Sequence, residues 1–337
     1  MLRELNVAVV GATGAVGREF LKILEQRPLP IKDIQLLSSK RSAGSYISVA
    51  GREIVVKETT PDCFDNVDIA FISVSADVSR QFAQIAVDKG ALVIDDSSAF
   101  RMIPDVPLVV PEVNGRDVQG HKGIISIPNC CTTPLAMILY PLHRINPIKR
   151  VVVDTYQSVS GAGGQAMIEL SEQSKAVAGG RPIEPQAFQH QIAFNLFPQI
   201  GDFYPSGYSD EEEKMIDETR KILHCPNLRI SATCVRVPVY KSHSEAVHLE
   251  LEHPMGPQEA LECLREMPGV AVMDDDGYAT PWNVAGTDDV YVGRVRKDQS
   301  VANGLAMWIV ADNLRKGAAL NALQIAEEVL RRDCLRG

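Results

Sequence analysis

The sequence has little of several features that mark whole classes of proteins. None of the apolar runs in its 337 residues approaches the ~18 residues that a membrane-spanning helix needs. The formal net charge is −9, so the chain has no excess of positive charge for binding nucleic acid or an anionic membrane surface. We therefore expect no nucleic-acid partner and no membrane partner, although a local basic pocket for phosphate groups is compatible with this charge.

Cysteine is also scarce. The seven cysteines are an odd number and lack the spacing of a disulfide framework, so we expect reduced thiols. There is no C-x-x-C pair and no run of Cys and His with ligand spacing, so we expect no metal. The N-terminal residues lead directly into a predicted strand without the layout of a signal peptide, which favours a cytoplasmic protein.

What the first half does have is a strand, a glycine-rich turn and a helix in succession. Val7–Val10 is a predicted buried strand, Gly11–Gly17 is the turn, and Arg18–Leu24 is a predicted amphipathic helix. Glycine permits positive φ and close approach of the backbone to a pyrophosphate, so this context predicts a dinucleotide-binding loop. The spacing is G-x-x-G-x-x-G rather than G-x-G-x-x-G, and an ordinary strand-to-helix turn is the alternative.

The end of the next predicted strand favours one nicotinamide cofactor over the other. Ile34–Leu37 is followed by Ser38–Ser42, which contains Lys40 and Arg41 but no carboxylate. An NAD site usually has an acidic residue here for the ribose 2′-hydroxyl, whereas cationic and hydroxyl groups suit a 2′-phosphate. We therefore expect NADP rather than NAD, with a solvated basic turn as the alternative.

Further apolar segments predict a parallel sheet with helices on both faces, because parallel strands are buried on both sides. The predicted strands lie at residues 68–73, 91–94 and 108–110, and a helix is predicted at 78–89. Arg101 follows the carboxyl end of one strand, where such sheets bind ligands, so it is placed to meet an anion. A surface salt bridge is the alternative for this side chain.

Beyond Pro141 the pattern changes to longer and more regularly alternating segments. We predict an α+β region with a mostly antiparallel sheet, a long ordered excursion at 182–207 and a closing amphipathic helix at 318–332. Asp210 is the expected cap of a helix over 210–223, whose first turn is acidic. The other predicted elements are strands at 151–156, 228–239, 246–252, 290–296 and 305–310 and a helix at 165–178.

One short stretch, Pro128–Pro134, carries the strongest chemical signal. It joins a predicted strand to a predicted buried helix, which Thr132 or Thr133 is expected to cap. A thiol here lies at the positive end of a helix dipole, which lowers its pKa, and the free N–H groups can stabilise an oxyanion. The alternative is that Cys130 and Cys131 are two small apolar residues in a turn.

Four other side chains are candidates that each have an ordinary structural explanation. His243 lies in a turn between predicted strands and is either an acid–base group or a structural histidine. Arg236 is either packed at the edge of the core or a carboxylate clamp. Glu211 and Lys214 lie on one helical face, where a solvent-facing ion pair is the alternative. The glycine-rich turn at 158–164 is otherwise a flexible link.

These motifs, in this order, resemble aspartate-β-semialdehyde dehydrogenases along nearly the whole chain. The matching segments are Gly11–Gly17, Ser97–Arg101, Pro128–Cys130, Gln157–Gly163, Glu211 with Lys214, Arg236–Val239, His243 and Lys316–Asn321. The resemblance implies an α/β protein with a Rossmann-like NADP-binding domain and a second, α+β domain for catalysis and dimerisation on a mostly antiparallel sheet. The implied boundaries are 1–128 for the first domain, with the C-terminal helix 314–337 packing back onto it, and 129–313 for the second.

The resemblance also implies a role for each candidate residue. Cys130 would be the nucleophile and His243 the general acid and base. Gln157, Glu211 and Arg236 would bind the substrate, and Arg101, Asn129 and Lys214 would hold the departing phosphate. The NADP site would be lined by Gly11, Thr13, Gly14, Ala15, Val16, Arg41, Ser42, Ser160, Gly161 and Asn321.

The implied activity is the NADPH-dependent conversion of L-aspartyl-4-phosphate to L-aspartate 4-semialdehyde and phosphate, through a cysteine acyl-thioester, by a homodimer. Its place would be the biosynthesis of lysine, diaminopimelate, threonine, methionine and isoleucine. An N-acetylglutamyl-phosphate reductase shares this chemistry, but its substrate lacks the free amine that Glu211 would meet. A catalytically silent relative that binds NADP is a second alternative, and the presence of both Cys130 and His243 argues against it.

Two positions depart from the pattern of that family. Cys131 stands where Ser or Thr is usual, and Cys131–Thr133 also matches the C-T-T of glyceraldehyde-3-phosphate dehydrogenases, so Cys131 is the alternative nucleophile. The Pro-Asn-Cys match and the flanking motifs favour Cys130. Ser242 precedes His243 where the family often has glycine, so we expect a changed loop geometry without loss of the catalytic group.

Overall fold

The computed structural model describes three ranges of the chain, which are 4–27, 29–274 and 277–335. The chain forms two compact units. The first contains the residues up to Pro128 together with those from Ala318 onward, and the second runs from Asn129 to Gly317. The seven cysteines, which all lie in these ranges, are free thiols. In the same ranges no helix has the length and apolar character needed to cross a membrane.

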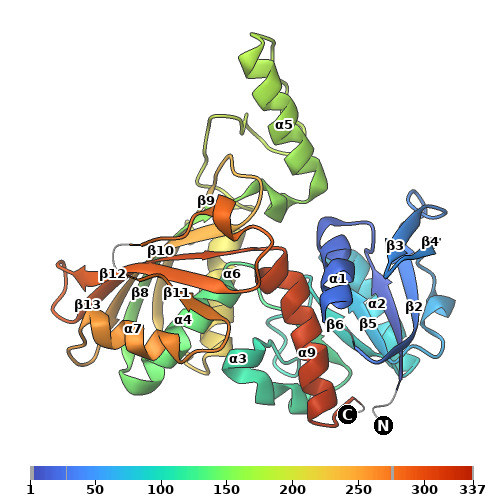
Figure 1. The fold of residues 1–337 in the computed structure, drawn as a ribbon, viewed down its shortest axis with the longest axis horizontal. Coiled ribbons are helices and arrows are strands. Elements are labelled where there is room, and N and C mark those ends of the chain that lie inside the picture. Colours follow the sequence, from blue (N-terminus) through green and yellow to red (C-terminus); the bar gives the residue numbers. More distant parts are fainter. Residues whose placement is uncertain (1–3, 28, 275–276, 336–337) are drawn as a thin grey trace. The chain divides into compact units, whose positions relative to one another are not determined.

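The first unit is a mostly parallel sheet. Its strands are β1 (Leu5–Val10), β2 (Ile31–Ser38), β3 (Tyr46–Val49), β4 (Arg52–Glu58), β5 (Ile69–Ile72), β6 (Leu92–Asp95) and β7 (Ile124–Ser126). Its α-helices include α1 (Ala15–Gln26), α2 (Ala76–Asp88), α3 (Pro111–Asn114) and α9 (Leu320–Arg331). The strand order is β3-β4-β2-β1-β5-β6-β7, and the pairs are parallel except for the hairpin of β3 and β4 (Figure 1).

Apolar side chains cover both faces of this sheet, as expected for parallel strands. Helices α1 and α9 pack on one face, where Phe20 of α1 stacks on Phe71 of β5 with ring centroids 4.3 Å apart. Helix α2 packs on the other face through Phe82, Ala83 and Ala86. Because β1 and β2 pair in register up to Val10 and Leu37, the glycine-rich turn after β1 lies next to the end of β2.

Two parts of the first unit differ from the prediction. The predicted strand at 108–110 is wrong, since Leu108 only pairs with Ser126 in an isolated bridge. Pro107 and Pro111 bracket this segment, and proline cannot donate to a strand ladder. The hairpin of β3 and β4 escaped prediction because β3 is a short edge strand and both strands expose polar residues.

The second unit is built on a six-stranded sheet. Its strands are β8 (Ile148–Gln157), β9 (Arg229–Arg236), β10 (His243–Leu251), β11 (Val270–Val272), β12 (Val290–Asp298) and β13 (Gly304–Ala311). Its α-helices include α4 (Thr132–Ile145), α5 (Gly164–Ala178), α6 (Asp210–Ile222), α7 (Pro257–Arg265) and α8 (Pro281–Val284). The order β11-β12-β13-β10-β8-β9 is mostly antiparallel, as predicted, with parallel pairs β8–β9 and β11–β12 (Figure 1).

The register of three strands aligns polar side chains at one end of this sheet. Gln157 of β8 pairs with Arg236 of β9, and Ser244 of β10 pairs with Tyr156, so His243, Gln157 and Arg236 lie side by side. A second row, two residues further along each strand, consists of Glu245, Thr155 and Cys234. Beyond these rows the same face is apolar and buried. Side chains alternate along a strand, so the polar rows occupy one face only.

Helix α6 begins with a different cap from the predicted one. Ser209, not Asp210, is the N-cap residue, and its backbone N–H donates to the Glu212 carboxylate at 2.7 Å. The other carboxylate oxygen of Glu212 accepts from the Cys234 backbone N–H at 2.9 Å, which fixes α6 against β9. Asp210 lies in the first turn and pairs with Lys214.

Candidate active site

At the N-terminus of helix α4, the side chain that accepts a backbone N–H belongs to an asparagine rather than to a threonine. Cys131 occupies the N-cap position, and its backbone N–H donates to Oδ1 of Asn129 at 2.8 Å. The backbone oxygen of Asn129 accepts the Thr133 N–H at 3.0 Å. The predicted capping by Thr132 or Thr133 is therefore wrong, because the Thr133 hydroxyl turns back to the Asn129 carbonyl at 3.3 Å. Pro134 lies in the first turn, as expected.

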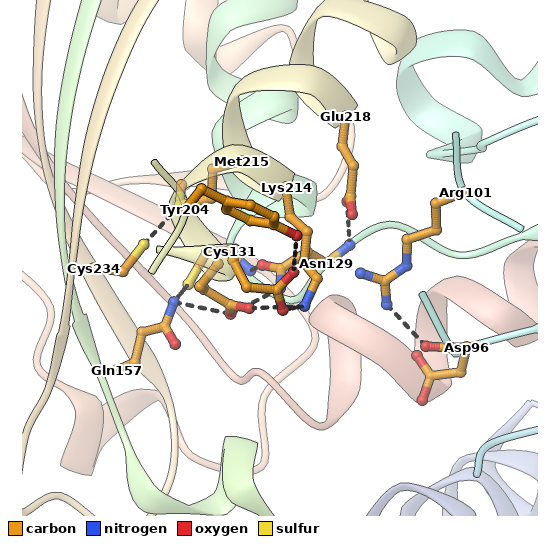
Figure 2. A network of polar contacts seen from close by, with 12 residues as sticks. Asp96, Arg101, Asn129, Cys131, Gln157, Tyr204, Lys214, Met215, Glu218 and Cys234 are labelled. Carbon is orange, nitrogen blue, oxygen red and sulfur yellow. Dashed lines mark hydrogen bonds and ion pairs between the residues drawn. The ribbon is translucent and has the colours of Figure 1, made fainter. Parts of the chain in front are cut away.

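Asn129 joins this turn to helix α6. Its backbone N–H donates to Glu218 at 2.6 Å, and its side-chain amide donates to Glu211 at 2.8 Å. The amide of Gln157 donates to the same oxygen of Glu211 at 3.3 Å and to the Cys131 sulfur at 3.0 Å. Figure 2 shows Gln157 reaching Cys131 while Glu218 meets Asn129. These hydrogen bonds fix the turn at 129–131 relative to Gln157 at the end of β8.

Two sulfurs and an imidazole nitrogen meet at this turn. The ligand atoms of Cys130, Cys131 and His243 all lie within 4.8 Å of one another. A hydrogen bond from the Cys131 thiol holds the pKa of Cys130 well below its usual value despite burial, and His243 and Arg236 lower it further. Burial and the neighbouring Cys130 raise the pKa of the Cys131 thiol well above its usual value. Cys130 is therefore the thiolate of the pair, and it is also the more exposed of the two.

We expect Cys130 to be alkylated by iodoacetamide at pH values well below the ~8.5 of a free thiol, because only the thiolate reacts. A lowered pKa keeps the thiolate present as pH falls, so the rate should decline only below that lowered value. Cys234 is the internal control, since burial raises the pKa of its thiol and it should stay unmodified. Alkylation rates against pH, with peptide mapping, measure both residues. A midpoint near the free-thiol value at Cys130 would contradict the structure.

His243 is held by its Nδ1 atom and presents its other nitrogen to the site. Nδ1 accepts the backbone N–H of Ser158 at 3.0 Å, and the Ser158 hydroxyl lies 3.1 Å from the same atom. Nε2 is buried and has no hydrogen-bond partner among the described residues. The bond pattern therefore assigns the proton of the neutral ring to Nε2. A Cβ built on Gly161 would come within 3.2 Å of Nε2, so glycine leaves room there.

Asn313 organises the backbone around His243 and was not among the predicted site residues. Its Oδ1 accepts hydrogen bonds from the Ser160 hydroxyl at 2.9 Å and from the Ser242 backbone N–H at 3.0 Å. It also accepts from the Ser158 hydroxyl at 3.3 Å. A buried polar residue directly after the apolar strand β13 is the signal that sequence reasoning could have used.

Ser242 has a left-handed backbone conformation, with φ of 68°. Glycine adopts this region without cost, which gives a physical reason for the glycine that the family often has here. The Ser242 hydroxyl is also buried, with no hydrogen-bond partner in the described part of the chain. Both features cost stability without contributing a catalytic group.

Ser242→Gly is expected to raise the free energy of unfolding by about 1 kcal/mol, because it relieves the left-handed strain and removes the buried hydroxyl. Urea denaturation followed by circular dichroism measures the change. Ser244→Ala is the matched control, since Ser244 has a similarly unpartnered hydroxyl but is not among the residues with positive φ. A Ser242→Gly protein less stable than the wild type would show that glycine's flexibility outweighs the strain.

Opposite charges lie near the cysteines. Arg236 is 5% exposed and donates from Nη1 to the Ser158 carbonyl at 2.7 Å. Burial lowers its pKa, but a guanidinium stays charged in proteins. Glu211 is buried, and the Lys214 ammonium lies 3.8 Å from its carboxylate. The site therefore offers one desolvated cation and one carboxylate to a substrate that carries both charges.

A buried acid lies behind the cysteines in the second polar row. Glu245 is 1% exposed, and neither carboxyl oxygen has a hydrogen-bond partner among the described residues. Burial and the negative charge on Cys130 raise the pKa of Glu245 well above its usual value. Both causes favour the neutral, protonated form of this side chain over the carboxylate. Sequence reasoning missed it, because an acidic residue in an alternating strand usually faces solvent.

In the first unit the glycine-rich turn has the geometry of a phosphate loop. Gly11 has φ of +87°, and a Cβ there would lie 2.1 Å from the Ser73 carbonyl oxygen. A Cβ on Gly17 would lie 2.3 Å from the Gly11 oxygen. Helix α1 starts after Gly14 without a side-chain cap, so its first N–H groups are suited to an anion. The Thr13 hydroxyl lies 2.9 Å from that of Ser38 at the end of β2.

The other predicted site residues divide between the two units. Arg41 is exposed and Ser42 half-buried in the turn after β2. Arg101 is buried in the first unit, where it donates to the Asp96 backbone oxygen at 2.8 Å. Asn321 is fully buried in α9 and donates to the Val109 carbonyl at 2.8 Å, which ties that helix to its own unit. The second unit brings together Asn129, Cys130, Gln157, Ser160, Gly161, Glu211, Lys214, Arg236 and His243.

Comparisons with known proteins agree with this arrangement. The sequence model "Semialdehyde dehydrogenase, NAD binding domain" matches residues 6–121, and "Semialdehyde dehydrogenase, dimerisation domain" matches residues 139–316. Aspartate-semialdehyde dehydrogenase of Aquifex aeolicus is 49% identical, over 96% of this chain and 97% of the relative. That of Bacillus subtilis is 47% identical, over 98% of each chain. The chain belongs to the aspartate-semialdehyde dehydrogenase family. It is thus an oxidoreductase, and the resemblance drawn from the motifs is confirmed.

Solved structures of the aspartate-semialdehyde dehydrogenase family share the fold. Aspartate semialdehyde dehydrogenase II from Vibrio cholerae, complexed with ASA, superposes with a TM-score of 0.96 at 41% identity, over 98% of this chain and 99% of that one. The Candida albicans enzyme with NADP gives a TM-score of 0.77 at 26% identity, over 98% and 100%. The predicted fold class, a Rossmann-like domain with a second α+β domain, is confirmed.

Proposed function

We propose that the chain catalyses the NADPH-dependent reductive dephosphorylation of L-aspartyl-4-phosphate to L-aspartate 4-semialdehyde through an acyl-thioester on Cys130, in the biosynthesis of the aspartate-family amino acids. The observation that carries the proposal is the cluster of a low-pKa Cys130, His243, Arg236 and Glu211 at one end of the second sheet. The names of the family members in the comparisons support the substrate.

The two charged side chains fit the two fixed charges of the substrate. Arg236 is the partner for the α-carboxylate, because a buried guanidinium binds a carboxylate through two parallel hydrogen bonds. Glu211 is the partner for the α-amino group. Gln157, which already bonds Glu211 and Cys131, orients the acyl group beside the nucleophile. By the motif resemblance, Asn129, Lys214 and Arg101 are proposed as the phosphate ligands.

The reaction begins when the Cys130 thiolate attacks the acyl carbon. The C–O bond to phosphate breaks, and phosphate leaves with the electron pair, stabilised by the cationic side chains. NADPH, when bound, would supply the hydride that reduces the thioester carbonyl carbon. His243, acting as the imidazolium, would then donate its Nε2 proton to the oxygen of the resulting thiohemiacetal and become the neutral imidazole. His243 recovers this proton as the C–S bond breaks, which releases the semialdehyde and restores the Cys130 thiolate.

The glycine-rich turn of the first unit fits NADP. The space at Gly11 and Gly17 is closed to any Cβ, and the uncapped start of α1 suits a pyrophosphate. Arg41 and Ser42 follow β2, where a 2′-phosphate is recognised in related folds. The residues proposed to line the site are Gly11, Thr13, Gly14, Ala15, Val16, Arg41, Ser42, Ser160, Gly161 and Asn321. The presence of NADP in the Candida albicans relative supports this choice.

The proposed assembly is a homodimer in the cytoplasm. A dimerisation domain matches residues 139–316, so most of the second unit corresponds to the part of the family that carries the subunit contact. The free cysteines of the described ranges are compatible with a reducing compartment. Analytical ultracentrifugation of the purified chain tests the dimer.

The proposed reaction is tested in reverse with aspartate semialdehyde, phosphate and either NADP or NAD, following the reduced nicotinamide by absorbance. Phosphate-dependent reduction of NADP is the expected result. N-acetylglutamate semialdehyde is the matched control substrate, because its amine is blocked and Glu211 has no cation to bind. Equal or faster turnover of this acetylated substrate would overturn the substrate assignment, and failure of both substrates would overturn the enzymatic proposal.

A further inference from the structure

Three side chains that can bind soft metal ions meet where the turn of Cys130 and Cys131 faces strand β10. The ligand atoms of Cys130, Cys131 and His243 lie within 4.8 Å of one another, although the histidine is far away in sequence. Thiolate and imidazole are the ligand set that Zn²⁺ and Cd²⁺ prefer. The resemblance described above implies Ser or Thr at the position of Cys131, so this sulfur ligand departs from the implied family pattern.

The distances suit one tetrahedral ion. Zinc–sulfur bonds of ~2.3 Å and zinc–nitrogen bonds of ~2.05 Å at tetrahedral angles place two sulfurs about 3.8 Å apart and a sulfur and a nitrogen about 3.6 Å apart. Ligand atoms separated by up to 4.8 Å therefore need to approach by at most about 1.2 Å. His243 is 2% exposed and its Nε2 has no hydrogen-bond partner in the described ranges, so this nitrogen is available to an ion once its ring proton has moved. Cys130 is partly exposed, which gives an ion a way in.

Binding of a divalent metal ion changes the protonation of all three ligands, and the neighbouring groups are compatible with these changes. Cys130 binds as the thiolate, and Cys131 loses its thiol proton to solvent. The ring proton of His243 moves from Nε2 to Nδ1, where the Ser158 hydroxyl oxygen at 3.1 Å accepts it, and the hydrogen bond from the Ser158 backbone N–H to Nδ1 is lost. Two thiolates neutralise the divalent ion, so the nearby Arg236 is no barrier. Two metal–sulfur bonds and one metal–nitrogen bond form, and water completes the coordination.

We propose that Cys130, Cys131 and His243 form a binding site for one soft divalent cation of the Zn²⁺ or Cd²⁺ class. Occupation of the site removes the free sulfur of Cys130. Binding therefore blocks the reaction reversibly, a consequence that rests on the proposed function, whereas binding itself does not.

The direct test is a titration of the full-length resting protein with Cd²⁺, followed by thiolate-to-metal charge-transfer absorbance. One Cd²⁺ per chain is expected, and Cys131→Ser should weaken the affinity about 100-fold or more, because it removes a ligand rather than an outer-shell contact. Cys225→Ser is the matched control. Cys225 lies 3.2 Å from His143 and forms the other cysteine–histidine pair of this unit, and this variant should bind like the wild type.

Two results of the titration would overturn the site. The first is unchanged Cd²⁺ affinity in Cys131→Ser, and the second is loss of binding in Cys225→Ser. X-ray absorption of the zinc-loaded wild-type protein needs no variant, and it should count two sulfur neighbours and one histidine nitrogen. A single sulfur neighbour would also reject the proposal.

Activity serves as a separate readout. If the titration succeeds, Cd²⁺ should abolish turnover of semialdehyde and phosphate, and EDTA should restore it. If the protein binds one ion through two sulfurs but shows no turnover without metal, the proposed function fails while the metal site stands.

Discussion

Replacing Cys130 with alanine is expected to lower the turnover of aspartate semialdehyde at least about 10⁴-fold, because no acyl-thioester can form without the nucleophile. The Cys131 thiol and His243 favour the Cys130 thiolate, whereas burial and the neighbouring Cys130 raise the pKa of the Cys131 thiol. Steady-state rates with NADP and phosphate measure the loss. NADP binding, followed by fluorescence, should persist, since Cys130 lies outside the glycine-rich turn.

Cys131→Ser provides the comparison that separates the two cysteines. Serine keeps a hydroxyl donor beside Cys130, so the loss at pH 7 should not exceed about 30-fold, the share of thiolate lost if the Cys130 pKa returned to ~8.5. Cys225→Ser controls for the removal of any thiol. If instead Cys131→Ser were inactive and Cys130→Ala active, the nucleophile would be Cys131, as the C-T-T reading suggests.

The features predicted best are those that a few neighbouring residues determine. The succession of strand, glycines and helix at 7–24 correctly predicted a turn at 11–17. Gly11 has the positive φ that such a turn requires. Pro134 was placed correctly in the first turn of α4 because proline tolerates few other positions in a helix. The antiparallel character of the second sheet followed in the same way from alternation along its strands.

The contacts that assemble the site depend on pairing between strands, which no local pattern encodes. His243 reaches Cys130 only because β10 pairs with β8 in one register, and a shift by one residue would turn it to the other face. For the same reason the cluster of Cys130, Cys131 and His243 cannot be recognised from the spacing of cysteine and histidine in the sequence. Asn313 and Glu245 escaped notice because each looks like an ordinary polar residue next to a strand.

Replacing His243 with glutamine is expected to lower kcat by about 10²–10⁴-fold, the usual contribution of a general acid–base group. Glutamine keeps an N–H donor of similar reach but cannot exchange a proton with the thiohemiacetal oxygen. KM for the semialdehyde should change little, because Arg236 and Glu211 carry the charge recognition. His248→Gln is the matched control, since His248 lies on the opposite face of β10 and bonds Asp298 at 2.8 Å.

A second experiment separates the roles of Cys130 and His243, because the two residues act at different steps of the reaction. Cys130 acts before hydride transfer and His243 after it, and the thiolate persists without His243 because the Cys131 thiol is the largest cause of its low pKa. His243→Gln should therefore still be acylated by aspartyl phosphate, and the thioester should accumulate as a mass increase on the peptide that contains Cys130. Cys130→Ala should show no such adduct. If His243→Gln failed to acylate, His243 would be needed to form the thiolate, and the division of labour between the two side chains would have to be reversed.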